Sequence, residues 1–218
     1  MYEITLVNLL QQLGFGMLQT LKVLPVCIVI TFILGLLIGS LRTLKLPLFN
    51  QIIIAYVFVM RGVPSLIVLM IIFFVANISD AFLAAIIGLS VYHTAYISEI
   101  VRGGIEAIPK GQFEAAYSLG LSTFQSLRKV VIPQIWYQTL PSIAGQYILL
   151  AKDTSLVSVV GMQDIMRIGK QLMQLAANPL IVYFFIAVFY YAICVLLQQF
   201  SLWIERGLQK KYGLYRAR

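Results

Sequence analysis

The stretch that decides the fold runs from Val23 to Leu41 and reads VLPVCIVITFILGLLIGSL. It contains no charged residue. At roughly 1.5 Å per residue, a helix of this length nearly crosses the hydrocarbon core of a bilayer, which is about 30 Å thick. The helix is expected to begin earlier, near Gly14. We therefore predict a membrane-spanning helix over residues 14–41.

The composition of the whole chain agrees with a membrane protein. Of its 218 residues, 61% are hydrophobic and 11% are charged, against roughly 25% charged in ordinary soluble domains. This balance excludes a disordered chain, a nucleic-acid-binding domain and an ordinary soluble enzyme. The length suffices for about five spans with short loops. Cys27 and Cys194 both lie in apolar stretches, so we expect two buried thiols rather than a disulfide.

Four further spans are predicted. The apolar stretch 46–76 is too long for one upright span, and it is interrupted at Arg61-Gly62-Val63-Pro64. Proline lacks an N–H and biases the preceding residue away from helix. We therefore predict a short helix over residues 48–60, a break, and a second span over residues 64–77. The other spans are expected at 81–100, 137–160 and 179–204, with an amphipathic surface helix over 161–178.

The distribution of Lys and Arg predicts the orientation of these spans. The turn with Arg42 and Lys45, the charged segment 101–135 and the basic tail from Arg206 to Arg218 fall on one side, and they hold most of the cations. The positive-inside rule therefore places the N-terminus outside and the C-terminus in the cytoplasm. The prediction is an all-α, multi-pass membrane protein in which residues 1–218 form a single transmembrane domain.

The charged segment 101–135 has the pattern of two short helices at a corner. Residues 110–119 suit a helix that Gly120 can end with a positive φ. Ser122 or Thr123 can cap the next helix, and Pro133 lies near the end of that helix. From these residues alone, the segment is either an ordinary amphipathic loop packed on the bilayer or a docking element presented to the cytoplasm.

This segment resembles the EAA loop of the membrane subunits of type I ABC importers, which reads Glu-Ala-Ala, three residues, Gly, nine residues, Ile, one residue, Leu-Pro. The strict positions are Glu114, Ala115, Ala116, Gly120 and Pro133, while Val130 and Ile132 replace the Ile and the Leu. Other stretches resemble the polar amino acid (glutamine, histidine or arginine) branch of that family: Gly16–Leu21, Arg61–Pro64, Tyr96–Gly104 and Lys152–Leu156. The family has Thr where Val63 stands.

The resemblance implies the type I ABC importer transmembrane fold, a bacterial inner-membrane location and an amino acid substrate. It also implies a second permease subunit (identical or paralogous), ABC ATPase subunits and an extracytoplasmic solute-binding protein. The chain has no G-x-x-x-x-G-K-[ST] phosphate loop, so we expect no enzyme activity and no bound cofactor, with ATP and Mg²⁺ used by the partner ATPase. The ATPase-coupling residues would be Glu114, Ala115, Ala116, Gly120 and Pro133.

Several charged residues fall within or near the predicted spans. Each costs a few kcal/mol or more at membrane depth unless it is paired or hydrated. A zwitterionic amino acid needs a cation and an anion a few Å apart, so we predict a substrate pathway lined by Arg61, Pro64, Tyr96, Glu99, Lys152, Asp153 and Ser155. The alternative is a buried network that fixes helix packing. Glu99 and Arg102 are three apart and can pair.

A metal site is not expected, because His93 is the chain's one histidine. We expect it to be packed and hydrogen-bonded rather than a metal ligand. A stand-alone carrier coupled to protons or sodium could use Glu99, Lys152 and Asp153, although it would not need a docking loop. An ABC permease for methionine, an organic amine or an oxyanion is a further alternative, because the EAA loop is shared across such importers. An intramembrane enzyme is disfavoured, since the sequence has no Ser/His or Asp/Asp motif.

Overall fold

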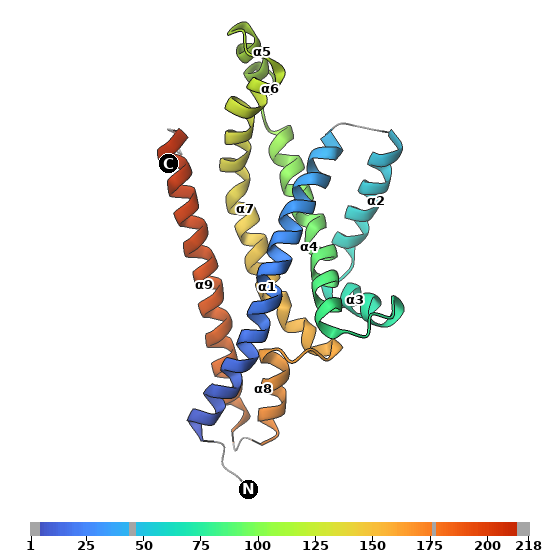
Figure 1. Cartoon of the computed structure of the whole chain (residues 1–218), viewed down its shortest axis with the longest axis vertical. Helices are drawn as coiled ribbons and strands as arrows, with labels where there is room; N and C mark the ends of the chain where they lie inside the picture. Colours follow the sequence, from blue (N-terminus) through green and yellow to red (C-terminus); the bar gives the residue numbers. More distant parts are fainter. Residues whose placement is uncertain (1–4, 44–46, 176–177, 213–218) are drawn as a thin grey trace.

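The computed structural model describes residues 5–43, 47–175 and 178–212, so Lys45, Arg216 and Arg218 of the predicted cytoplasmic cations lie outside the described residues. In these ranges the protein is built from helices (Figure 1). Their bounds are α1 Leu6–Thr43, α2 Pro47–Gly62, α3 Ser65–Met70, α4 Ala81–Glu106, α5 Lys110–Ser118, α6 Thr123–Ser126, α7 Ile132–Asp153, α8 Ile165–Met173 and α9 Pro179–Tyr212. π-helical turns follow α3 (Ile71–Val75) and precede α7 (Leu127–Val131), and a 3-10 helix follows α7 (Thr154–Val160).

The long helices match the predicted spans but extend past them. Within the described residues, four helical stretches are long and apolar enough to cross a membrane: Leu6–Thr43, Ala81–Glu106, Arg128–Val160 and Pro179–Lys210. Three of them begin or end several residues outside the predicted spans 14–41, 81–100 and 179–204. The fourth starts upstream of the predicted 137–160 and includes its 3-10 end. A helix does not stop at the end of its apolar stretch, because polar residues can also adopt helical backbone angles. In the last turns of α4, for example, Arg102 and Glu106 form an i,i+4 ion pair.

The second predicted span, residues 64–77, differs most from the structure. Only α3, with six residues, and a five-residue π-helical turn occupy this region. At roughly 1.5 Å per residue they rise about 16 Å, half of a bilayer's hydrocarbon core. The break before Pro64 bends this pair by 112° from the preceding α2. A fifth span therefore requires α2 and α3 together, because the bend falls inside the crossing element rather than before it.

The contact between α1 and α4 organises the bundle. Gly35 and Gly39 lie on the side of α1 that faces Ile97, Ser98 and Val101 of α4. A Cβ at Gly39 would stand 2.5 Å from the Ser98 carbonyl oxygen, so only glycine permits this approach. Small residues at such positions are typical of membrane helices, which associate through close packing rather than through the hydrophobic effect.

The amphipathic segment predicted at 161–178 forms α8, which is shorter than that range. Its apolar stripe consists of Ile165, Ile168 and Leu172, and all three side chains are buried against the rest of the protein. The helix packs on α1 and α9, and the backbone N–H of Ile165 donates to Thr20 Oγ1 at 3.4 Å. The segment is thus part of the core at the end of the bundle where the chain begins (Figure 1), with Lys170 exposed on its outer side.

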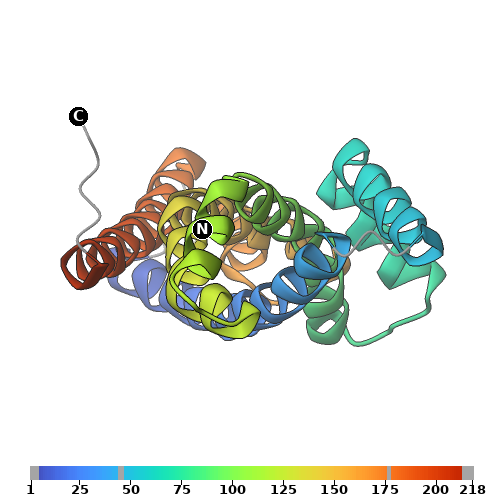
Figure 2. The ribbon, with the colours of Figure 1, turned by 90° about the horizontal axis from the view of Figure 1, so that it is seen from above.

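Seen along its long axis, the molecule is an elongated slab (Figure 2). The α2–α3 pair occupies one end of the slab and α9 the other, with α1, α4 and α7 between them. The α5–α6 pair projects beyond the ends of the long helices at the opposite end of the bundle from α8 (Figure 1). Cys27 is buried, Cys194 is half-buried, and both are free thiols.

Candidate functional site

The corner between α5 and α6 is built from local hydrogen bonds. Gly120 follows the end of α5 with a φ of +76°, as the sequence predicted. The N–H of Gly120 donates to the Tyr117 carbonyl at 2.9 Å, and the N–H of Leu121 donates to the Ala116 carbonyl at 3.1 Å. This pair of bonds is the Schellman motif, which satisfies the last carbonyls of a helix and turns the chain away from its axis.

The next helix begins with a reciprocal cap at Ser122, one of the two predicted capping residues. The Gln125 N–H donates to Ser122 Oγ at 3.3 Å, and the Ser122 N–H donates to Gln125 Oε1 at 3.0 Å. This arrangement is a capping box, which fixes the entry of a helix at two donors. The capping box begins at the residue that follows the Schellman motif, so the two define the angle of the α5–α6 corner without help from distant residues.

The side chains of the EAA motif divide into an outward and an inward set. Glu114 and Ala115 are exposed on α5, whereas Ala116 is buried. Pro133 is buried at the start of α7, not near the end of the capped helix as predicted. The first turn of a helix tolerates proline, which has no N–H. The chain leaves α6 through the π-helical turn Leu127–Val131 and continues directly into α7. The corner is therefore joined to the long helix α7 by continuous helical backbone.

Two arginines flank Glu99 near the same end of the bundle. Arg102 pairs with Glu99, as predicted, and also with Glu106. Arg42 at the end of α1 forms a further ion pair with Glu99. The carboxylate of Glu99 is thus shared by two guanidinium groups and links α1 to α4, which accounts for its charge without a ligand.

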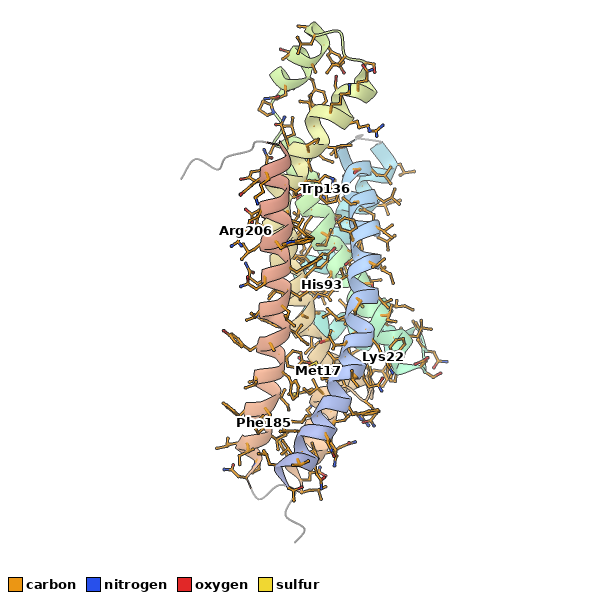
Figure 3. The ribbon with its side chains drawn as sticks, turned by 60° about the vertical axis from the view of Figure 1, so that its left-hand side comes forward. Met17, Lys22, His93, Trp136, Phe185 and Arg206 are labelled. Atoms are coloured by element: carbon orange, nitrogen blue, oxygen red, sulfur yellow. The ribbon has the colours of Figure 1, made fainter. Side chains whose placement is uncertain are left out.

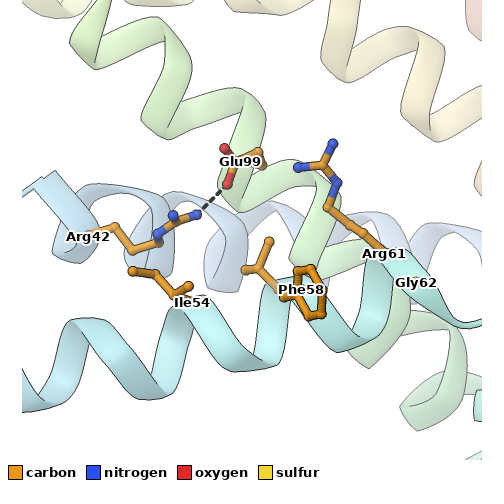
Figure 4. A pocket seen from close by; sticks show the side chains of 7 residues that line it. Arg42, Ile54, Phe58, Arg61, Gly62 and Glu99 are labelled. Atoms are coloured by element: carbon orange, nitrogen blue, oxygen red, sulfur yellow. Dashed lines mark hydrogen bonds and ion pairs between the residues drawn. The ribbon is translucent and has the colours of Figure 1, made fainter.

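Arg61 lies beside this network without joining it. A pocket of about 390 Å³ is lined by Arg42, Ile54, Val57, Phe58, Arg61, Gly62 and Glu99, and Figure 4 shows Arg61 and the Arg42–Glu99 pair along the same α2–α4 face. The Arg61 guanidinium lies 5.9 Å from the centre of the Tyr96 ring, within range of a cation–π contact. The Tyr96 hydroxyl is in turn 3.0 Å from that of Tyr92.

Asp153 has a different set of partners in the middle of the bundle. Its Oδ2 lies 3.3 Å from His93 Nε2, and His93 Nδ1 is 2.8 Å from Gln146 Nε2. The His93 side chain is 1% exposed, and Figure 3 shows it inside the bundle. His93 is therefore packed and hydrogen-bonded, as predicted. It also lies edge-on to Tyr92, with ring centres 5.2 Å apart, so contacts run from Arg61 through the two tyrosines to Asp153.

The other predicted pathway residues are not gathered at one point. Lys152 is exposed and forms no ion pair with any described residue, and it points away from Asp153, since neighbours on a helix diverge by about 100°. Ser155 is half-buried in the 3-10 helix, and its carbonyl accepts a hydrogen bond from Ser158 Oγ at 2.9 Å. Pro64 is exposed at the bend between α2 and α3.

A family model described as binding-protein-dependent transport system inner membrane component matches residues 8–210. The chain belongs to this family. It is 33% identical over 202 residues to the L-cystine transport system permease protein TcyL of Bacillus subtilis, covering 88% of this chain and 84% of that protein. It is likewise 33% identical over 199 residues to the arginine transport system permease protein ArtQ of the same organism, covering 89% and 91%.

Solved structures agree with this assignment. A chain of an amino acid ABC transporter crystallised with histidines superposes with a TM-score of 0.82 at 27% identity, covering 94% of this chain and 99% of that one. A chain of the inward-facing MetNI methionine ABC transporter gives a TM-score of 0.78 at 25% identity, covering 91% and 97%. This inner membrane component therefore has the transmembrane fold of ABC importers, as the EAA segment indicated.

The polar contacts of this permease include Tyr92, Gln146 and Arg42, for which the sequence analysis predicted no partner and no place in the pathway. Tyr92 precedes Tyr96 and Glu99 by four and seven positions, so helical spacing alone places the three on one face of α4. Gln146 precedes Asp153 by two helical turns, which is also a readable signal. Arg42 is 57 positions from Glu99, and no sequence pattern joins the two.

A buried carboxyl group also lies outside the pathway. Asp164 caps α8, accepting from the N–H groups of Met166 at 3.2 Å and Arg167 at 3.0 Å. Its side chain is 0% exposed, and burial raises the pKa of this carboxyl group to about 6. Within the described residues, no three His, Cys, Asp or Glu side chains gather in a way that could hold a metal ion.

Proposed function

We propose that this permease subunit passes an amino acid across the membrane at its interface with a second permease subunit, powered by ABC ATPase subunits and supplied by a solute-binding protein. ATP and Mg²⁺ are used by the ATPase, and this chain holds neither. The C-terminus and the α5–α6 corner face the cytoplasm, and the N-terminus faces outside. The amino acid substrate is supported by relatives and a solved structure that carry amino acids in their names.

The observation that carries this proposal is the α5–α6 corner. It projects beyond the long helices (Figure 1), and its outward side chains include Glu114 and Ala115. Because Gly120 and the Ser122 cap fix the corner locally, a partner that grips it moves it as a unit. That displacement passes through the continuous helical backbone into α7 and so towards Asp153 at its far end. A two-state change in the ATPases is thereby coupled to the membrane helices.

The substrate would move along the α2–α4 face. Arg61 forms no ion pair with the described residues and lies over the face of Tyr96, so its guanidinium remains available to a carboxylate. Asp153 contacts a histidine rather than an arginine or lysine, so its carboxylate can accept the ammonium group. Glu99 instead holds α1 and α4 together through Arg42 and Arg102. Its role in the pathway would be to shape the pocket rather than to bind the substrate.

The test is a gentle detergent purification of this chain from its native membrane, with mass spectrometry of the proteins that accompany it. We expect an ATP-binding subunit in an amount equal to the permease chains taken together, with either one permease species or two. Amino acid uptake into native vesicles should stop when ATP is depleted and should survive collapse of the ion gradients. Recovery of this chain alone, with uptake that follows the ion gradient, would contradict the proposal and favour a stand-alone carrier.

A further inference from the structure

A second groove lies at the other end of the slab from the polar pocket. It has a volume of about 470 Å³ and is formed by α1, α7 and α9, with a lining that includes Ile28, Phe32, Trp136, Ile143, Leu197 and Phe200. The Arg61 pocket belongs to the α2 end of the slab and this groove to the α9 end (Figure 2). The groove therefore does not belong to the proposed substrate pathway.

The length of the groove matches one leaflet of a bilayer. On α7 its lining runs from Trp136 to Tyr147, and on α9 from Leu197 to Leu208. At roughly 1.5 Å per residue, each edge is about 16 Å long, half of the hydrocarbon thickness. The α9 edge belongs to the half of α9 that lies nearer to α5 and α6, and the α7 edge lies over the middle of α7 (Figure 1). The groove thus extends from mid-membrane to one interface.

Two cations and a tryptophan line a cavity beside the groove. This adjoining cavity of about 440 Å³ shares Ile204 and Leu208 with the groove and is also lined by Trp203, Arg206 and Lys210. Arg206 and Lys210 are four apart on α9, so they lie on one face of the helix. Both are exposed, and neither forms an ion pair with the residues that the structure describes. Figure 3 shows Arg206 and Trp136 on the α9 side of the bundle.

We propose that this groove binds one anionic phospholipid from the leaflet on the α5–α6 side, the cytoplasmic leaflet in the proposed orientation. One acyl chain lies between α7 and α9, and the phosphate is held by Arg206 and Lys210. An apolar groove one leaflet long suits an acyl chain, and basic pockets at this level of a membrane protein favour anionic headgroups. A second copy of the protein packed into the apolar groove would leave the two cations of the adjoining cavity without a role.

The two tryptophans of the chain make this site directly measurable. In the variant Trp203→Phe, Trp136 is the one remaining tryptophan, and it lines the groove, where its ring stacks on Phe32 at 5.4 Å. The full chain is reconstituted in phosphatidylcholine vesicles that contain a minor fraction of brominated phosphatidylglycerol. Bromine quenches tryptophan only at short range. We expect stronger quenching than with the same fraction of brominated phosphatidylcholine.

The variants separate this site from bulk attraction of anionic lipid. Arg206→Gln with Lys210→Gln should lower the relative affinity for phosphatidylglycerol, by about fivefold per cation. The matched control Arg128→Gln with Lys129→Gln removes two exposed cations away from the groove and should leave that affinity unchanged. Ala144→Phe, which fills the groove, should reduce quenching by both lipids.

Three results would overturn the proposal. Equal quenching by the two brominated lipids would indicate ordinary boundary lipid. Equal losses in the two double variants would indicate bulk electrostatics. Absence of quenching at Trp136 with strong quenching of Trp203 in the Trp136→Phe variant would show that a protein surface covers the groove.

Discussion

At the α5–α6 corner, the hydrogen bonds that close the turn join residues three to five apart, such as Gly120 to Tyr117 and Leu121 to Ala116. Where α1 meets α4, the ion pair of Arg42 with Glu99 joins residues 57 apart, and Gly39 packs directly on the backbone of Ser98. Both regions depend on a glycine, but for different reasons. Gly120 is needed for its φ, whereas Gly39 is needed for the space that a side chain would take.

This difference distinguishes a surface whose side chains can bind a partner from an interior whose side chains all contact other parts of the chain. The corner holds its shape without burying Glu114 or Ala115, so those side chains remain available to a partner. At the α1–α4 contact the glycines allow close packing and the charged side chains pair with each other. A change there should disturb the whole bundle. Substitutions in the two regions should therefore affect different measurements: stability in the interior, and coupling at the corner.

The largest effect is expected for Gly39→Leu. Its side chain would collide with the Ser98 carbonyl, and because backbone cannot move aside cheaply, the variant should lose about 3 kcal/mol of stability. That corresponds to roughly 6–12 °C in Tm for a chain of this size, measured in detergent. Gly14→Leu on the same helix is the control, since a Cβ there meets no atom within 4 Å. Equal stability of the two variants would contradict the close packing of α1 on α4.

Gly120→Val should leave the bundle intact and abolish ATP-driven uptake. A β-branched residue in the left-handed region costs about 1–2 kcal/mol, which is enough to distort the corner but not to unfold the long helices. Gly120→Asn, which tolerates a positive φ, should retain most of the uptake. Membrane abundance and uptake are measured together. Normal uptake by the valine variant would remove the coupling role from the corner.

Asp153→Asn should reduce amino acid uptake roughly tenfold, because a charge-assisted contact to the substrate ammonium is worth about 1.5 kcal/mol or more. The amide can still contact His93, so the Tm should change little. The measurement is the KM for uptake beside the Tm of the purified chain. A lower Tm with unchanged uptake kinetics would make Asp153 a structural partner of His93 and nothing more.

Asp164 combines a local cap with burial, and its effect should appear as a dependence on pH. The pKa of its carboxyl group is about 6 in the folded protein and about 3.9 in an unfolded chain. At a pH between these two pKa values the folded state binds more protons than the unfolded state. The contribution of Asp164 to stability is therefore greatest below pH 4 and is lost as the pH rises through 6. The loss amounts to about 3 kcal/mol at most.

Asp164→Asn keeps a cap acceptor that cannot ionise, so the Tm of this variant should be a few degrees higher at pH 7 and should vary less between pH 4 and 6. The control is Asp80→Asn at the exposed cap of α4, where Asp80 Oδ1 accepts from the Phe82 N–H at 2.8 Å. That variant should keep the wild-type profile. An unchanged profile in the Asp164 variant would show that another group titrates in this range.

Structural features that depend on short stretches of sequence were predictable. The apolar lengths predicted the long helices, Pro64 predicted the break, and Gly120 with Ser122 predicted the corner, because each depends on the conformational preferences of neighbouring residues. The corner's partner stays a prediction, since binding to another chain is not a property of these residues alone. Helix α4 continues past the predicted span 81–100 to Glu106, because polarity marks the end of an apolar stretch and not the end of a helix.

By itself, the sequence determined an all-α membrane protein, because composition, hydrophobic length and local turn chemistry require no knowledge of distant contacts. The ABC importer family was indicated by the resemblance of residues 114–133 to the EAA loop. Only the tertiary structure decided that α2 and α3 meet at 112°, that Arg42 rather than a substrate neutralises Glu99, and that Asp153 meets His93. These features depend on which helix faces lie against one another. The packing of the whole bundle determines which helix faces meet, and short-range sequence patterns do not predict it.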